Sequence, residues 1–161
     1  LYPCDLLFVH RDAEGEDPEV RHQEIQNAIQ EAEKKCFQIP AVCVVPVKMT
    51  ESWLLLDEYA IRCAAGNPNG NNPLNMPDLS KIEHVSDPKG LLFRILEEAS
   101  GLTGRRLKKF KTSKRREARI RITELISDFS PLQQLNAFQR LESDIIVLKQ
   151  NKWNLEADKG T

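Results

Sequence analysis

Two acidic side chains, Asp12 and Glu14, follow directly on an apolar run near the start of the chain. Carboxylates two residues apart in a loop can both reach one ion, and Mg²⁺ commonly takes one or two carboxylates together with water and substrate phosphates. A metal held there polarises a phosphodiester and lowers the pKa of an attacking water. We therefore treat Asp12 and Glu14 as candidate catalytic residues and ligands of Mg²⁺ or Mn²⁺. The alternative is that they are surface acids, or ion-pair partners of Arg11 and of a basic segment farther along the chain.

Two further residues are candidates for catalysis. His10 is a candidate general base, because histidine is the side chain that most often takes that role near neutral pH, although a histidine at a strand end is more often a hydrogen-bonded structural residue. Glu51 falls in the first turn of an expected helix, where the helix dipole favours an anion. Trp53, two residues on, is expected in the core.

A concentrated basic segment lies between Arg105 and Arg121, with ten basic residues and one acid, whereas the rest of the chain carries a balance of −10. Such charge asymmetry favours an anionic binding partner. The alternative is a solvated helix face whose charges are balanced by the protein's own acids. Phe110 could stack on a base but is more simply a core residue. We expect the first part of the segment to contact phosphates, through Arg105, Arg106, Lys108, Lys109 and Lys111.

Composition limits the class of protein. The chain has 161 residues, 40% of them hydrophobic and 29% charged, as in a soluble globular domain. Its four cysteines form no CxxC pair, which predicts reduced thiols in a cytoplasmic protein rather than a zinc site. No apolar run is long enough to span a membrane. Because the chain opens at Leu1 almost directly into a strand, we expect an N-terminal strand of the natural protein to be missing.

The first secondary-structure elements that the sequence predicts form a strand–helix–strand unit, which positions Asp12 and Glu14. Residues 5–10 read as a buried strand, and Asp17-Pro18 as the start of an amphipathic helix to residue 36. The continuous β-branched run at 39–47 predicts a second strand, buried on both faces as in a parallel sheet. A site is then expected where the first strand ends, at the carboxyl edge of the sheet.

In the rest of the chain, the sequence predicts helices joined by one long loop. We expect a single domain over 1–161, with a βαβα part at 1–66, a loop at 67–86 and a helical basic part at 87–153. The expected helices are a mostly buried one at 51–62 capped by Thr50, then 87–99, 113–128 and one that starts at Ser130-Pro131. The tail after Trp153 is expected to fray.

The residues as they stand resemble the Toprim domain of topoisomerases, primases and ATPase-associated nucleases. The acids that follow the first strand match the acid pair of that domain, with His10 where the first Asp would stand. More specifically, Glu51-Ser52-Trp53-Leu54 through Asp57 resembles the Glu-Ala-Trp-Leu…Asp motif of an uncharacterised Toprim-like bacterial family. The basic stretch 106–111 and the closing helix from Pro131 to Leu141 match its later part, so the resemblance covers roughly the whole chain.

The resemblance implies an α/β fold of Toprim-like (Rossmann-like) type, a mostly parallel sheet flanked by helices with a helical C-terminal part. It implies a Mg²⁺-dependent nuclease acting on DNA, whose acids hold the metal together with a glutamate from an earlier strand. Genes of that family often lie beside ABC-type ATPases in phage-defence loci, so an ATPase partner and an oligomer are further expectations.

Three hypotheses follow for function. The first is a metal-dependent phosphodiesterase. The second is a catalytically degenerate Toprim-like module that binds a partner ATPase or nucleic acid without chemistry, which the presence of His10 in place of an acid favours. The third is that the basic segment contacts only the acids of its own chain, so that nucleic-acid binding is negligible even at low salt.

Overall fold

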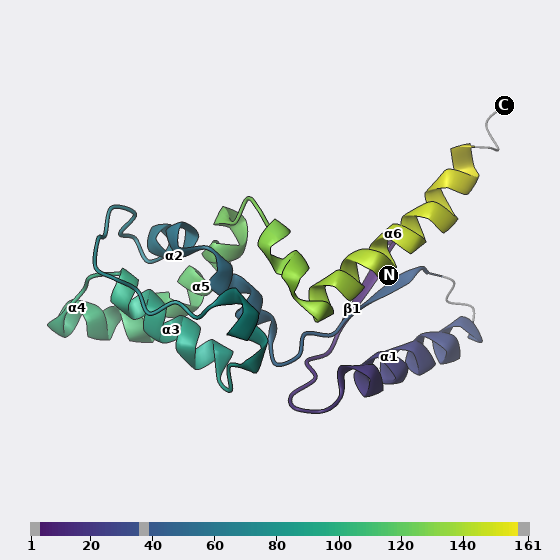
Figure 1. The fold of residues 1–161 in the computed structure, drawn as a ribbon, viewed down its shortest axis with the longest axis horizontal. Coiled ribbons are helices and arrows are strands. Elements are labelled where there is room, and N and C mark those ends of the chain that lie inside the picture. The colour runs from purple at the N-terminus through teal and green to yellow at the C-terminus, as the bar shows by residue number, and fades with distance from the viewer. Residues whose placement is uncertain (1–3, 36–38, 158–161) are drawn as a thin grey trace. The chain divides into compact units, whose positions relative to one another are not determined.

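The computed structural model describes residues 4–35 and 39–157, with side chains as far as residue 151 (Figure 1). The protein is a mixed α/β chain, mostly helical, and its described part holds one two-stranded parallel sheet. It divides into two compact units, which are described separately: Leu1–Val47 with Leu135–Thr161, and Lys48–Gln134. The expected boundaries at residues 66 and 86 do not coincide with this division, and the single domain stays a prediction.

The first unit is built on the expected strand–helix–strand arrangement. Strand β1 (Leu7–His10) pairs in parallel with β2 (Ala41–Val44), and α1 (Pro18–Glu33) connects them. The helix starts where the sequence predicts, because the Asp17 side chain accepts a hydrogen bond from the Glu19 N–H at 2.9 Å and proline occupies the first helical turn. The parallel βαβ prediction is therefore confirmed. The predicted end of this helix at Cys36 lies outside the described residues.

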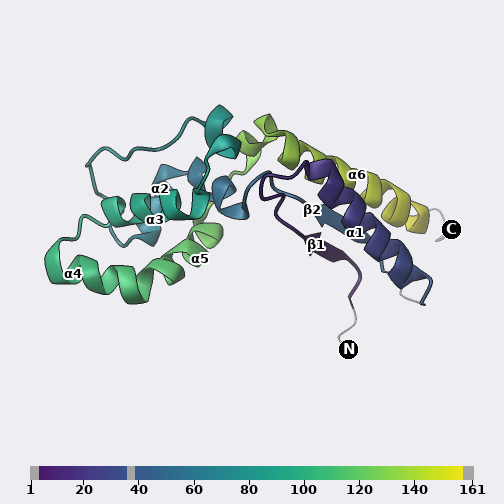
Figure 2. The same ribbon diagram turned by 90° about the horizontal axis from the view of Figure 1, so that it is seen from below.

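Helix α6 (Asn136–Ala157) lies alongside β2 and completes the first unit (Figure 2). The unit's core includes a small cluster made of Ala13, Ile25, Cys43 and Val45, with Val9 and Ile29 packed against it. The prediction that the first strand is buried is wrong at Leu7 and Phe8, which are 46% and 53% exposed. The physical reason is that, within the described residues, β2 is the one strand beside β1.

The second unit is helical throughout its ordered elements. Helices α2, α3 and α5 pack against one another around fully buried side chains such as Ile61, Leu92 and Ile122. In chain order its elements are η1 (Thr50–Leu56), α2 (Glu58–Ala64), η2 (Leu79–His84), α3 (Pro88–Ala99), α4 (Gly104–Lys109), η3 (Phe110–Lys114), α5 (Arg115–Leu125) and η4 (Ser130–Gln134).

The predicted helix at 51–62 is wrong, because the chain breaks it at Asp57. This residue is extended (φ −123°, ψ 100°), and its carboxylate accepts a hydrogen bond from the Ala60 N–H at 2.9 Å. An N-cap of this kind stabilises a helix by about 1 kcal/mol. The stretch before Asp57 forms the 3₁₀ helix η1, and α2 begins after it. Glu51 and Asp57 therefore do not share one helix.

The later helices follow the sequence with shifted boundaries. Helix α3 begins as predicted after Asp87, whose side chain accepts the Gly90 N–H at 2.8 Å. The basic segment is helical from Gly104 rather than from residue 113, and runs without a break through α4, the π-helical turn η3 and α5. We call residues 104–125 the basic helix. The helix predicted to start at Ser130-Pro131 is divided in two, a separate turn η4 followed by α6. Helix α6 continues to Ala157. Residues 158–161 lie outside the described chain.

Candidate functional site

The first predicted cluster, His10, Asp12 and Glu14, lies at and just beyond the carboxyl end of β1. The backbone continues the pairing past the strand, since the Arg11 N–H donates to the Val44 carbonyl at 3.1 Å. His10 Nε2 lies 3.1 Å from Asp12 Oδ1, close enough for an ion pair when the imidazole is protonated. Glu14 is exposed on a turn with φ of 53°, a conformation that non-glycine residues rarely adopt. The structure thus brings His10 and Asp12 together and leaves Glu14 in solvent.

One oxygen of Asp12 is unusual. Asp12 Oδ1 is closed off from solvent and, within the described residues, accepts no aligned hydrogen bond, although His10 is near. A buried polar atom without a partner costs about 1–3 kcal/mol. The alternative that Arg11 neutralises the acids is not what the structure shows, because Arg11 pairs with Glu24 at 3.0 Å.

The described residues do not complete a Mg²⁺ site at this position. Mg²⁺ requires near-octahedral oxygen ligation, and the cluster offers one enclosed carboxylate, one imidazole and one solvent-exposed acid. No group of three His, Cys, Asp or Glu side chains placed to hold a metal occurs in the part of the chain that is described. We therefore derive no reaction step through a metal.

Glu51, the remaining predicted catalytic residue, belongs to the second unit and has an ion-pair partner there. Its side chain is 7% exposed and accepts a short hydrogen bond from the guanidinium of Arg119 on the basic helix. Because a buried carboxylate is expensive without such a partner, the pair accounts for Glu51 structurally. Its catalytic role stays a prediction. Trp53 is buried, which confirms its expected place in the core.

The basic helix is held to its own unit by a second carboxylate, Glu97 of α3. One Glu97 oxygen lies 2.7 Å from Lys111 Nζ and the other 3.0 Å from Arg115 NH1, and the carboxylate is only 13% exposed. The Arg115 guanidinium also stacks on Phe93, 4.2 Å from the ring centroid. Phe110 is buried, which confirms the core interpretation of that side chain. These contacts fix which face of the basic helix turns inward.

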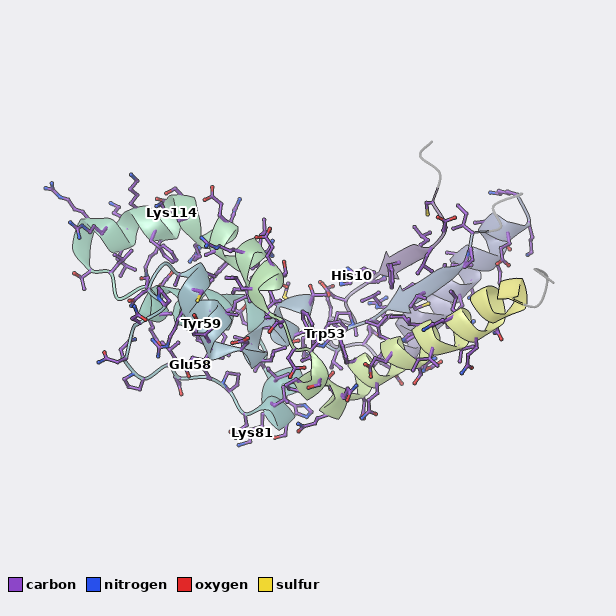
Figure 3. The ribbon with its side chains drawn as sticks, turned by 90° about the horizontal axis from the view of Figure 1, so that it is seen from above. His10, Trp53, Glu58, Tyr59, Lys81 and Lys114 are labelled. Carbon is purple, nitrogen blue, oxygen red and sulfur yellow. The ribbon has the colours of Figure 1, made fainter. Side chains whose placement is uncertain are left out.

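Three of the ten basic residues therefore form ion pairs within the unit, Lys111 and Arg115 with Glu97 and Arg119 with Glu51. Lys111, a predicted phosphate contact, is thus already engaged. The other seven are exposed and form no ion pair with the described residues. They are Arg105, Arg106, Lys108, Lys109, Lys114, Arg116 and Arg121. Figure 3 shows Lys114 on this helix, from which many long side chains extend into solvent.

The sequence did not single out Glu97, on which the orientation of the basic helix depends. The available signal was an acid next to the apolar stripe of α3, followed by basic residues about 14 and 18 positions later. Glu97 and its two partners lie on different helices, so a periodicity argument within one helix could not pair them.

The first unit contains two buried titratable groups away from the predicted cluster. Burial and the neighbouring Arg140 lower the pKa of His22 below its usual 6.5, against smaller opposing effects of Asp144 and Glu19. Burial and Asp144 raise the pKa of the Cys43 thiol. His22 Nδ1 has no hydrogen-bond partner among the described residues.

Comparison with known proteins adds no assignment. No protein-family model, no curated protein and no solved structure matches the chain. Within the described residues, none of the helices combines the length and apolar character needed to cross a membrane.

We predict that His22 makes the stability of the protein pH-dependent. Because the pKa of His22 is lowered in the folded state, the unfolded chain binds the proton more readily. The free energy of unfolding is therefore retained above about pH 6.5 and falls as the pH drops below that value. The decrease is at most about 1.4 kcal/mol per pH unit. Denaturant unfolding at pH 7.5, 6.5 and 5.5 measures this. His22→Gln should flatten the pH dependence, and the exposed control His84→Gln should not. Equal slopes in all three proteins would contradict the prediction.

Proposed function

We propose that this protein binds DNA through the basic helix. The observation that carries the proposal is the set of seven exposed cationic side chains on one helix that no acid of the described chain neutralises. Salt bridges to Glu97 and Glu51 occupy only the three cations on its inward side. The hypothesis that the basic segment only forms ion pairs with acids of its own chain accounts for those three cations and not for the other seven.

The dimensions of the helix suit a phosphate backbone. Residues 105 to 121 span about 24 Å at 1.5 Å per residue, and a DNA strand presents a phosphate about every 3.4 Å along the duplex axis. Arginines on this surface can each engage a phosphate with two parallel hydrogen bonds. Several cations can therefore meet successive phosphates of one strand, which supplies affinity without selecting a sequence.

The Toprim-like fold remains part of the proposal. Its support is the parallel βαβ unit with Asp12 just beyond the carboxyl end of β1, the position at which open α/β sheets place ligands. Metal-dependent hydrolysis of DNA is the second candidate function. The buried Oδ1 of Asp12, which accepts no aligned hydrogen bond from the described residues, favours it, because a bound cation would stabilise that oxygen.

The DNA-binding proposal predicts a steep salt dependence that the exposed lysines control. In Lys108→Ala/Lys109→Ala, two phosphate contacts are lost, so the slope of log K against log salt should fall in magnitude by about 2. Fluorescence anisotropy with a labelled oligonucleotide at several salt concentrations measures the slope. The matched control is Lys34→Ala/Lys35→Ala, two exposed lysines after α1, which should keep the wild-type slope. A double variant that binds like the wild type would refute the proposal.

The second candidate predicts divalent-metal-dependent nicking of plasmid DNA. Nicking should occur with Mg²⁺ or Mn²⁺, stop with EDTA, and be lost in Asp12→Asn, which removes the charge but keeps the shape of the side chain. Glu16→Gln, an exposed acid of the same turn, is the control and should retain activity. If the wild type never nicks DNA that it binds, the protein is a binding module without chemistry.

A further inference from the structure

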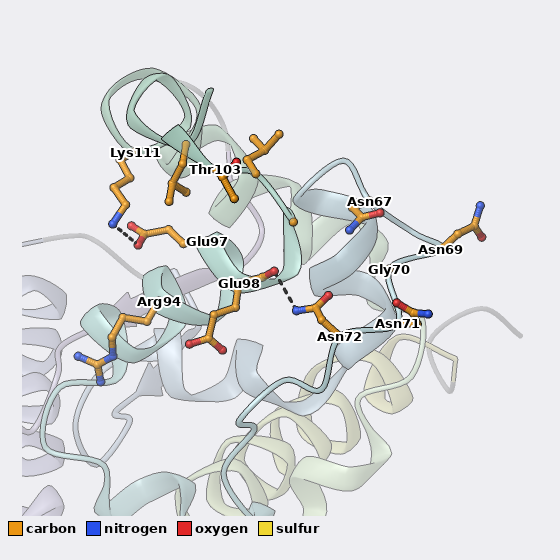
Figure 4. A pocket seen from close by; sticks show the side chains of 13 residues that line it. Asn67, Asn69, Gly70, Asn71, Asn72, Arg94, Glu97, Glu98, Thr103 and Lys111 are labelled. Atoms are coloured by element: carbon orange, nitrogen blue, oxygen red, sulfur yellow. Dashed lines mark hydrogen bonds and ion pairs between the residues drawn. The ribbon is translucent and has the colours of Figure 1, made fainter. Parts of the chain in front are cut away.

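We propose that the second unit takes an unpaired nucleobase into a cavity beside the basic helix, so that its preferred ligand is single-stranded nucleic acid. This inference rests on the proposed DNA binding and deepens it. The cavity has a volume of about 840 Å³, within the range of small-molecule sites. It lies between the asparagine-rich loop at residues 67–73, the end of α3 and the start of the basic helix (Figure 4).

The cavity adjoins the first part of the basic helix. Leu107 and Lys111 of the basic helix line one side, and Thr103 precedes the helix on the same side. Lys111 is turned toward Glu97 across this wall, as the dashed line in Figure 4 marks. In this proposal, a strand whose phosphates contact the exposed cations of the same helix places a base in the cavity.

The loop that forms the opposite wall is fixed in place by polar contacts. Asn67 Nδ2 donates to the Ala99 carbonyl at 2.9 Å, and Asn72 Nδ2 donates to the Glu98 carbonyl at 3.0 Å, so both asparagines hold the loop to the end of α3. Arg62, only 7% exposed, donates to the Asn72 carbonyl at 2.6 Å. These bonds offset the entropy of ordering a loop that contributes almost no apolar surface. Polar loops held on a rigid scaffold commonly carry binding residues.

Several polar groups at the cavity remain available to a ligand. Asn71, Arg94, Glu98 and Thr103 are exposed, and their side chains have no hydrogen bond or ion pair recorded among the described residues. Asn69, by contrast, points away from the cavity in Figure 4. The set combines donors, acceptors and both signs of charge, so it does not suit a phosphate alone.

A nucleobase matches this combination. Its edge presents donors and acceptors together, which amide and hydroxyl groups can satisfy, and its face can lie on an apolar side chain or on an arginine plane. Leu102 and Leu107 supply apolar surface, and Arg94 supplies the guanidinium. In a duplex the pairing edge of each base is already occupied, so the cavity can accept only an unpaired base.

The test compares two 12-nucleotide single strands that carry the same phosphates, one with all its bases and one in which the six central positions are abasic. Anisotropy titrations at low salt should show the wild-type protein binding the complete strand at least about tenfold more tightly. In Asn71→Ala/Thr103→Val, which leaves the charge unchanged, the preference should fall below about threefold while binding of the abasic strand stays the same. The control Asn75→Ala/Ser80→Ala alters exposed residues that do not line the cavity and should keep the preference.

The possible failures are distinguishable. Equal, salt-sensitive binding of both strands would overturn the base-binding inference and leave the proposed DNA binding intact. A preference retained in Asn71→Ala/Thr103→Val would also overturn it, as would tighter binding of the corresponding duplex. If neither the two single strands nor the corresponding duplex binds at low salt, both the inference and the proposed function fail.

Discussion

The interaction on which the second unit depends is the ion-pair triad around Glu97. The basic helix carries ten basic residues and only two acids, so its like charges repel one another unless acids from other elements offset them. Glu97 changes this, because its two oxygens engage Lys111 and Arg115 on successive turns, and the buried Glu51 engages Arg119 in the next. Low exposure of both carboxylates makes these pairs less sensitive to salt than surface bridges.

The same contacts divide the cations of the basic helix into two groups. Lys111, Arg115 and Arg119 pair with acids of α3 and η1, and the other seven have no ion-pair partner among the described residues. The inward apolar residues Phe110, Ala118 and Ile122 set this orientation together with the ion pairs. The surface that we propose to bind DNA is therefore a consequence of how the helix is packed, and the cavity at its start is where we propose that a base binds.

Local patterns in the sequence predicted much of this fold. The Asp17-Pro18 start of α1 and the β-branched run of β2 are signals within single elements, and the structure confirms both. The break at Asp57 was missed because the apolar residues around it favour one continuous helix, although its side chain was a possible cap. Glu97 was missed because its partners come from another element. Patterns also could not show that Asp12 is enclosed while Glu14 is exposed, since only the turn after β1 decides that.

The central claim is that the solvent-facing cations of the basic helix, and not its packed ones, contact DNA. Lysine acetylation followed by mass spectrometry, with and without bound DNA, tests it residue by residue. The account predicts slower acetylation of Lys108, Lys109 and Lys114 in the complex, with no change at Lys34 or Lys35. If all five lysines slow equally, or none slows under conditions in which DNA is bound, the claim is contradicted.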